Sequence, residues 1–181
     1  MERTTNPISQ ELDAIRSMNI GEKQKFMYDW MDKHYEECKV YSLSELPEDL
    51  RNTIITATHF TTFKKHECYV NATNMLLNAR GIFSSRGYDI HYIEGKMTIG
   101  KVVPIDHAWV KFISRSGDTY YFDPTSEFVL DNSNKDEIYV KFLELNIDET
   151  FNILLEKQYY GSWIFDIVKE EYDRVQSQVL Q

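Results

Sequence analysis

Long apolar runs are missing from this chain of 181 residues. The opening stretch, MERTTNPISQELDAIRS, has no apolar segment of the kind found in secretory signal peptides, and no later stretch approaches the length needed to cross a bilayer. We therefore expect a soluble, cytoplasmic protein without a membrane partner. Because 42% of the residues are hydrophobic and 14% are aromatic, the sequence predicts one globular domain over residues 1–181.

Basic residues are scarce as well. Twenty lysines and arginines stand against 29 aspartates and glutamates, which gives a formal net charge of −9. A protein that binds nucleic acid through its phosphates needs a basic surface to release counterions. The charge balance therefore argues against nucleic acid as a partner.

Only two cysteines are present, Cys38 and Cys68. A cytoplasmic chain with enough apolar residues for a core does not need a disulfide, so we expect two free thiols. The sequence has no Cys-x-x-Cys, His-Glu-x-x-His or acidic EF-hand pattern, and the scattered His66, Cys68 and His107 do not make a metal-ligand motif. We predict no metal and no other cofactor.

The spacing of apolar residues predicts helices at both ends of the chain and a sheet between them. Helical periodicity covers residues 19–35, 44–57, 59–81 (with Gly81 as the stop), 146–161 and 162–181. Alternation predicts strands in 88–95, 96–103, 107–113 and 119–123, separated by polar or glycine-containing turns, while 138–145 fits a strand or a helix. The expected fold is α+β, with a helical extension over 1–60, a core over 60–130 and C-terminal helices over 146–181.

The threonines within 59–81 are possible caps of the expected helix, so Cys68 should lie in its first turns. The thiolate is the nucleophilic form of cysteine, and the N–H groups and dipole at a helix start favour it. A buried structural thiol is the alternative, because free cysteine is among the most buried residue types.

Residues 107–125, HAWVKFISRSGDTYYFDPT, alternate around a polar turn and predict a β-hairpin. A four-residue loop over 114–117 would place His107 beside Pro124, one residue from Asp123. We expect a three-residue loop, or a bulge at Gly117, to place His107 opposite Asp123 on one face. Cross-strand neighbours lie roughly 5 Å apart, so the two side chains would then hydrogen-bond. The alternatives are a core histidine and an aspartate that only forms the turn before Pro124.

Four short motifs occur in the order CYVNA at 68–72, YIEG at 92–95, HAWV at 107–110 and YFDPT at 121–125. Together they resemble the core of the transglutaminase-like branch of the papain-like fold. The resemblance implies a nucleophile helix packed on an antiparallel sheet. It implies Cys68 as nucleophile, His107 as base and acid, and Asp123 as the residue that orients the imidazole. The implied reaction is acyl transfer or hydrolysis through a thioester, on a peptide, a protein or a small amide or ester.

Two features set this chain apart from the protein-crosslinking members. A small residue, commonly glycine, often stands shortly before the cysteine, where this chain has Lys65, His66 and Glu67. The tryptophan that helps hold the oxyanion in those members has no counterpart here, since the only upstream tryptophan is Trp30. The resemblance therefore implies a hydrolase or small-scale acyltransferase. The alternative from another class is an inactive binding protein that recognises a peptide or partner in the same cleft.

Three further residues are candidates for substrate contact. Glu94 has a family-like position, with an exposed strand glutamate as the alternative. Asn71 can hydrogen-bond a substrate, with a solvated helix side chain as the alternative. Trp109 is the third candidate, with the alternative, which alternation favours, that it faces away from the catalytic side and packs in the core. We expect His66 to be a surface residue.

Overall fold

The computed structural model describes residues 5–130 and 137–179. Its five strands form one antiparallel sheet in the order β1-β5-β2-β3-β4. The strands are β1 (Glu36–Cys38), β2 (Tyr88–Ile99), β3 (Val103–Ser114), β4 (Thr119–Phe122) and β5 (Tyr139–Leu145). The α-helices in the described residues are α1 (Pro7–Arg16), α2 (Glu22–Lys33), α3 (Glu48–Thr58), α4 (Cys68–Ser85), α5 (Pro124–Phe128), α6 (Ile147–Lys157) and α7 (Ile164–Val179). The predicted α+β class is confirmed, and 138–145 resolves as a strand.

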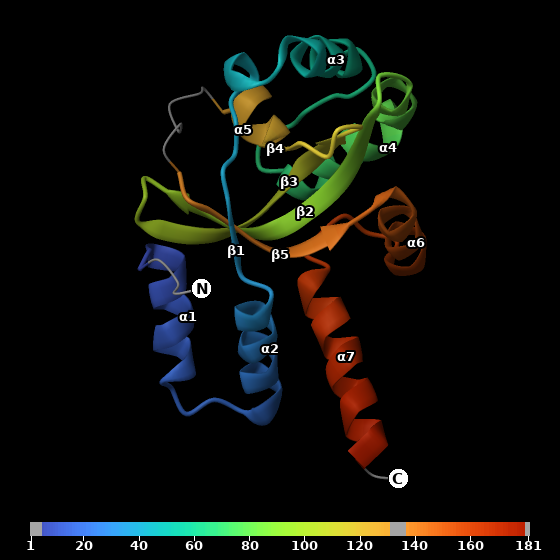
Figure 1. The fold of residues 1–181 in the computed structure, drawn as a ribbon. Helices are drawn as coiled ribbons and strands as arrows, with labels where there is room; N and C mark the ends of the chain where they lie inside the picture. The colour runs from blue at the N-terminus through green and yellow to red at the C-terminus, as the bar shows by residue number, and fades with distance from the viewer. Residues whose placement is uncertain (1–4, 131–136, 180–181) are drawn as a thin grey trace.

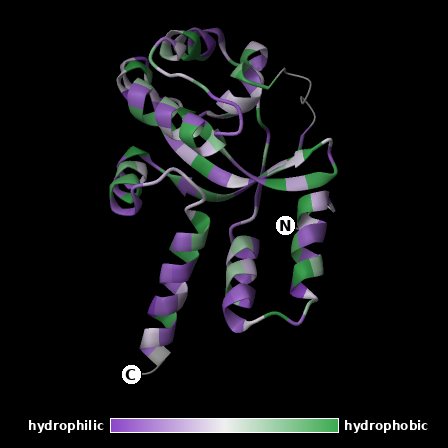
Figure 2. Ribbon diagram, turned by 180° about the vertical axis from the view of Figure 1, so that it is seen from behind, coloured by the Kyte–Doolittle hydropathy of each residue, from purple (hydrophilic) through white to green (hydrophobic). Residues whose placement is uncertain are grey.

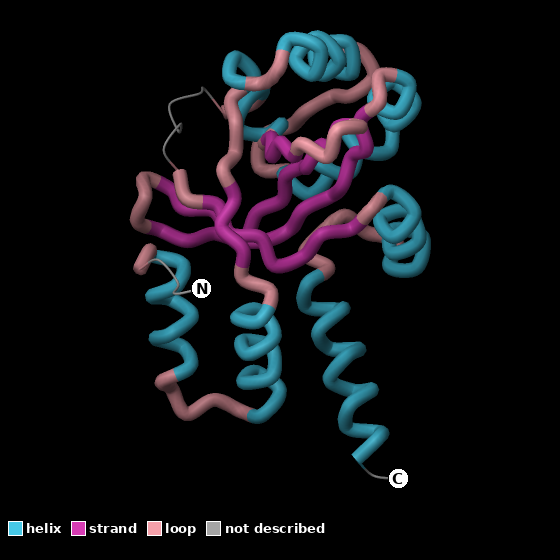
Figure 3. The backbone as a smooth tube through the Cα atoms, in the orientation of Figure 1, coloured by secondary structure: helices cyan, strands magenta, loops and turns pink. Residues whose placement is uncertain are grey.

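The helices lie on two sides of the sheet. Figure 3 shows the strands as a central band, with α3, α4 and α5 above it and α1, α2 and α7 below it. Hydrophobic and hydrophilic residues alternate along α1, α2 and α7, as Figure 2 shows, which is the pattern of helices with one buried side. No helix in the described part of the chain is both long and apolar enough to cross a bilayer.

Helix α4 packs along β2 and β3 because its apolar residues recur at helical spacing. Ala72, Met75, Leu76, Ala79 and Phe83 are all fully buried. The ring of Phe83 packs on Phe112 of β3, with centroids 4.8 Å apart. This packing fixes the start of α4, where Cys68 lies, relative to β3.

The sheet closes on itself. Cys38 at the end of β1 pairs with Tyr139 of β5, while Val40, two residues later, bridges to Tyr121 of β4. The two edge strands of the sheet, β1 and β4, are therefore brought together. In Figure 1 the β1 segment crosses in front of the sheet. A second, smaller apolar cluster, formed by Cys38, Ile93, Met97, Trp109 and Tyr139, fills the inside of this closure.

Two glycines that were expected to end elements lie inside them instead. Helix α4 continues past Gly81 to Ser85, and β2 continues past Gly95 to Ile99, so the two strands expected over 88–103 are one long strand and a turn. The turn is made by Gly100 and Lys101, whose φ values are 60° and 61°. Gly95 lies at a register shift between β2 and β5, where the backbones approach closely.

Gly81→Ala should raise the free energy of unfolding by about 0.5–1 kcal/mol, because glycine destabilises a helix interior by that amount relative to alanine. A methyl group at position 81 would meet no atom within 4 Å. Denaturant unfolding measures the change. Gly87→Ala is the control and should destabilise, since Gly87 has a φ of 84° and its Cβ would lie 2.5 Å from Nε of Arg115. A Gly81→Ala variant less stable than the wild type would contradict the finding that a methyl group at position 81 meets no other atom.

Candidate active site

Cys68 is the first residue of α4 and is half-buried. No side chain caps this helix start in the described structure, so its first N–H groups lie at the thiol end of the helix without intrahelical partners. The chain enters α4 through His66, whose φ of 63° is in the left-handed region that favours glycine and tolerates histidine. His66 therefore supplies the conformation that a glycine would adopt freely, and its side chain is exposed, as expected.

Asn71 anchors the loop before Cys68. Its Oδ1 accepts the N–H of Lys64 at 2.9 Å, and its Nδ2 donates to the carbonyl of Lys64 at 2.8 Å and to the hydroxyl of Thr125 at 2.9 Å. The side chain is fully buried. These bonds join the loop to α4 and α5, so the structure gives Asn71 a positioning role in place of the substrate contact considered from the sequence.

His107 and Asp123 are in direct contact, at 2.7 Å between Nε2 and Oδ2. The hairpin loop has three residues, 115–117, because Ser114 pairs with Asp118. The ladder pairs Val110 with Phe122, so one step further Asp123 falls opposite Trp109 and reaches His107 diagonally. The expectation that His107 lies directly opposite Asp123 was therefore wrong in register, although both side chains share a face.

Asp123 also caps the helix that follows it. Its Oδ1 accepts the N–H groups of Thr125 and Ser126 at the start of α5, at 2.9 and 3.1 Å. Its Oδ2 accepts the hydroxyl of Tyr139 at 2.9 Å in addition to His107. Burial would raise the pKa of Asp123, but the charge of His107 and these hydrogen bonds hold it below its usual range. These contacts hold the carboxylate in one position and favour its ionised form. Asp123 therefore both caps the turn into α5 and binds His107.

His107 lies between Asp123 and Cys68. Burial would lower the pKa of His107, but the charge and hydrogen bond of Asp123 and a hydrogen bond with the Cys68 thiol raise it from 6.5 to about 10. Since Asp123 occupies Nε2, Nδ1 is the nitrogen left for the thiol. The contact with Asp123 therefore favours the protonated imidazole, which faces a thiol at a helix start.

Trp109 packs beside His107, which corrects the expectation that it faces away. Residues two apart on a strand share a face, and the two rings are 6.2 Å apart with an interplanar angle of 20°. Trp109 is fully buried and meets Tyr139 edge to face at 5.3 Å. Its Nε1 has no hydrogen-bond partner in the described structure. Its role is to pack the imidazole and Tyr139 in place, and it has no exposed surface for a substrate.

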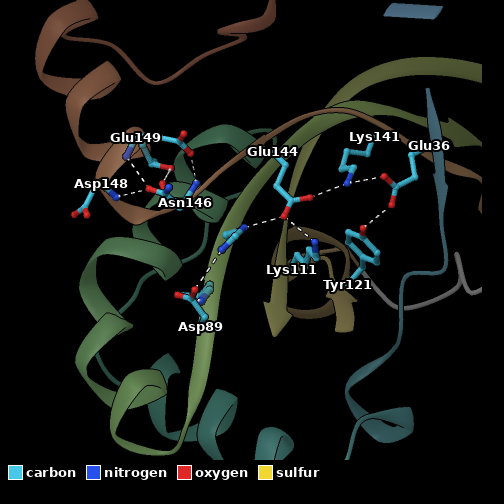
Figure 4. Close-up of polar contacts among 12 residues, drawn as sticks. Glu36, Asp89, Lys111, Tyr121, Lys141, Glu144, Asn146, Asp148 and Glu149 are labelled. Carbon is cyan, nitrogen blue, oxygen red and sulfur yellow. Dashed lines mark hydrogen bonds and ion pairs between the residues drawn. The ribbon is translucent and has the colours of Figure 1, made fainter. Parts of the chain in front are cut away.

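An ion network is drawn in Figure 4. It includes His91 and Lys111, a cross-strand pair four residues along β3 from His107, and by alternation Lys111 shares the sheet face of His107. Glu144 accepts from Nδ1 of His91 at 2.8 Å and from Nζ of Lys111 and of Lys141 at 2.7 Å each, and Lys141 also pairs with Glu36 of β1 at 2.8 Å. Burial would raise the pKa of Glu144, but these three donors hold it well below its usual range. The network ties β1, β2, β3 and β5 together and so holds the sheet closed.

Both cysteines are free, as predicted, but their surroundings differ. Cys38 is buried in the smaller apolar cluster, and burial raises its pKa to about 12. A thiol in that state is a poor nucleophile at neutral pH. Cys68 is the more accessible thiol and has the imidazolium beside it.

Glu94 is fully buried and ties the start of α7 to β2. Its carboxylate accepts from the N–H groups of Trp163 and Ile164 at 3.0 and 3.2 Å, from the hydroxyl of Ser162 at 2.5 Å and from that of Tyr92 at 3.1 Å. The side chain is therefore neither an exposed strand glutamate nor open to a substrate. Burial raises its pKa from 4.5 to about 7, although the four donors oppose this shift.

The burial of Glu94 predicts a pH dependence of stability. Between pH 4.5 and 7 the folded chain keeps a proton on Glu94 that the unfolded chain has released, so this group lowers stability as the pH rises. The effect is at most about 3 kcal/mol. Glu94→Gln cannot ionise at this position. The free energy of unfolding of the variant minus that of the wild type, measured in denaturant titrations, should therefore increase from pH 5 to pH 7.

Glu144→Gln is the control of opposite sign. The pKa of Glu144 is lowered, so the stability that it contributes is present at neutral pH and lost in acid. The free energy of unfolding of the wild type should therefore increase relative to that of Glu144→Gln as the pH rises. Parallel pH profiles of Glu94→Gln and the wild type would contradict the burial of a titrating carboxyl at position 94.

No group of three or more His, Cys, Asp or Glu side chains converges as a metal site within residues 5–130 and 137–179. Comparison of the chain with protein-family models, with curated proteins and with solved structures finds no match.

Proposed function

We propose that the protein is a cysteine-dependent acyl-transfer enzyme, of the transglutaminase-like and papain-like type, that hydrolyses or transfers the acyl group of a peptide, protein or small amide or ester. The observation that carries the proposal is the position of His107 between Cys68 and Asp123. One ring nitrogen bonds Asp123 at 2.7 Å, and the thiol of Cys68 bonds the same imidazole. A nucleophile, an acid–base and an orienting carboxylate in contact make up a working unit for covalent catalysis.

The first half of the reaction forms a thioester. The Cys68 sulfur attacks the carbonyl carbon, and the carbonyl oxygen becomes an oxyanion beside the backbone N–H of Cys68 at the helix start. The His107 imidazolium gives its proton to the leaving amine or alcohol, and the bond from the carbonyl carbon to that group breaks. Asp123 holds the ring orientation throughout.

The second half releases the acyl group. Neutral His107 takes a proton from water or an amine, whose oxygen or nitrogen attacks the thioester carbon. Collapse of the second oxyanion breaks the carbon–sulfur bond and returns Cys68 as the thiolate beside the imidazolium. The raised pKa of His107 favours the imidazolium form that donates the proton in the first half of the reaction.

Alkylation of Cys68 by iodoacetamide tests the proposal. At pH 6, followed by peptide mass mapping, His107→Ala should slow the labelling of Cys68 by about tenfold or more, because the imidazolium that favours the thiolate is gone. His66→Asn is the matched control: it removes an exposed imidazole two residues from Cys68 and keeps a residue type that tolerates the left-handed conformation. Its labelling should match the wild type.

Equal labelling of the wild type and of a folded His107→Ala variant would count against catalysis. That result would favour the alternative, a protein that binds a peptide or partner in the cleft without reacting. Cys38 serves as the internal standard, since a buried thiol with a pKa near 12 should stay unlabelled in each folded variant.

A further inference from the structure

The outer edge of β3 is open over its first half. Strand β4 ends at Phe122, opposite Val110, whereas β3 begins at Val103 and pairs with β2 along its whole length. No strand in the described residues pairs with 103–109 on the side away from β2. A stretch of strand next to His107 therefore has one unpaired edge.

The pairing of the hairpin shows which groups face this edge. The N–H of Ser114 bonds the carbonyl of Asp118 on β4 at 2.9 Å, so even-numbered residues of β3 direct their backbone groups toward the β4 side. By the same alternation the N–H and C=O of Asp106 and the C=O of Pro104 face the open edge. The Asp106 side chain is 47% exposed, with its carboxylate 3.2 Å from Nζ of Lys96. Along this edge Val103 and Asp106 are exposed, and Pro104 and Ile105 are half-buried.

The tip of the β2–β3 hairpin presents apolar side chains beside this edge. Ile99, Val102 and Val103 are 50%, 69% and 55% exposed. The turn is held firmly, because Glu137 accepts the N–H groups of Gly100 and Lys101 at 2.8 and 3.0 Å. A fixed turn that displays three adjacent aliphatic side chains to water has the character of a binding surface.

The edge leads directly into the site. Asp106 immediately precedes His107, and the four steps from Val103 to His107 span roughly 13 Å of extended strand. Pro104 and the charged Asp106 are the residue types that keep an edge from pairing with another sheet, which limits the edge to a short partner. The open edge and the apolar tip are therefore contiguous, and the edge runs along β3 up to His107, whose own side chain is only 4% exposed.

We propose that the outer edge of β3 over residues 103–106, with the tip residues Ile99 and Val102, docks an extended segment of a polypeptide substrate as an added strand. This inference rests on the proposed function and narrows its substrate class to polypeptides. The occupant is a polypeptide because the free groups are main-chain donors and acceptors at strand spacing, which an extended peptide matches. A small amide at Cys68 would reach neither the edge nor the tip.

Two chloromethyl ketone probes of Cys68 test the docking. One is a mixed-sequence hexapeptidyl glycine chloromethyl ketone, and the other is acetylglycine chloromethyl ketone. The peptide probe should label Cys68 about tenfold faster or more. Methylation of alternate backbone nitrogens of the peptide, or Val102→Lys in the protein, should each remove about tenfold of this advantage. Val175→Lys on α7, at a valine 36% exposed, is the matched control and should keep it.

The outcomes separate the two proposals. Equal rates for the two probes, or an advantage that survives both N-methylation and Val102→Lys, overturn the docking surface while labelling that depends on His107 leaves the proposed function standing. Labelling by both probes that is unchanged in folded His107→Ala overturns the proposed function, and this inference with it.

Discussion

Asp123→Ala should lower the free energy of unfolding by about 3–5 kcal/mol, because it leaves a buried imidazolium without its counter-charge. The carboxylate is 2% exposed and accepts hydrogen bonds from His107, Tyr139, Thr125 and Ser126. Its loss also leaves the buried Tyr139 hydroxyl without this acceptor and removes the cap of α5. Urea unfolding of the wild type and the variant measures the change.

Asp123→Asn separates the charge from the cap. Asparagine keeps the volume and the oxygen that caps α5, so this variant should lose less stability than Asp123→Ala. The pKa of His107 should fall from about 10 toward or below 6.5, since burial remains and the main cause of the increase is gone. An NMR titration of the His107 ring reports this directly.

Asp106→Asn is the comparison, because Asp106 adjoins His107 in sequence but pairs with Lys96 at the surface. Surface pairs contribute at most about 1 kcal/mol, so this variant should change little. A pKa of His107 that stays unmoved in Asp123→Asn would contradict the ion pair.

Gly95→Ala is the second variant with a large expected effect and should lower stability by about 3 kcal/mol or more. A Cβ at position 95 would lie 2.0 Å from the carbonyl oxygen of Val140 and 3.0 Å from Cα of Lys141 and Cη2 of Trp109. Two of these neighbours are backbone atoms of β5, so the strands would have to separate. Overpacking of a core commonly costs 1–3 kcal/mol, and backbone clashes cost more.

The same glycine-to-alanine change at position 81 should stabilise, so the two variants form an internal comparison. The sign differs because a Cβ meets open space at Gly81 and the β5 backbone at Gly95. Thermal unfolding of the pair measures both. Equal effects of the two substitutions would contradict the close approach of β2 and β5 at the register shift. Loss of Cys68 labelling in Gly95→Ala is also expected, since Trp109 and His107 pack next to Gly95.

The contact of His107 with Asp123 was predictable because it is local. Both residues lie in one hairpin, so only the parity of its loop decides the contact: a three-residue loop puts the two side chains on one face, and a four-residue loop would put them on opposite faces. The register itself was not predictable, because it depends on the three-residue loop at 115–117 and Gly117 with its φ of 90°. The placement of Cys68 at a helix start followed from helical periodicity in the same way.

The partners of Glu94 and Asp123 were missed because they come from later segments. Ser162, Trp163 and Ile164 reach Glu94 from the start of α7, and Tyr139 reaches Asp123 from β5. Hydrophobic patterns carry no information on such tertiary contacts. One signal was present for Glu94: it shares the parity of Ile90 and Tyr92, so alternation already indicated a buried carboxylate that needs donors.

Acylation of Cys68 by p-nitrophenyl acetate is the most direct test of the central claim that Cys68 forms a thioester assisted by His107. We predict a burst of p-nitrophenolate with an acetyl group on Cys68 in the intact-mass spectrum. The burst should persist in Cys38→Ala, disappear in Cys68→Ala and slow markedly in His107→Ala. A burst of the same size in Cys68→Ala, or none from the folded wild type, would contradict the account.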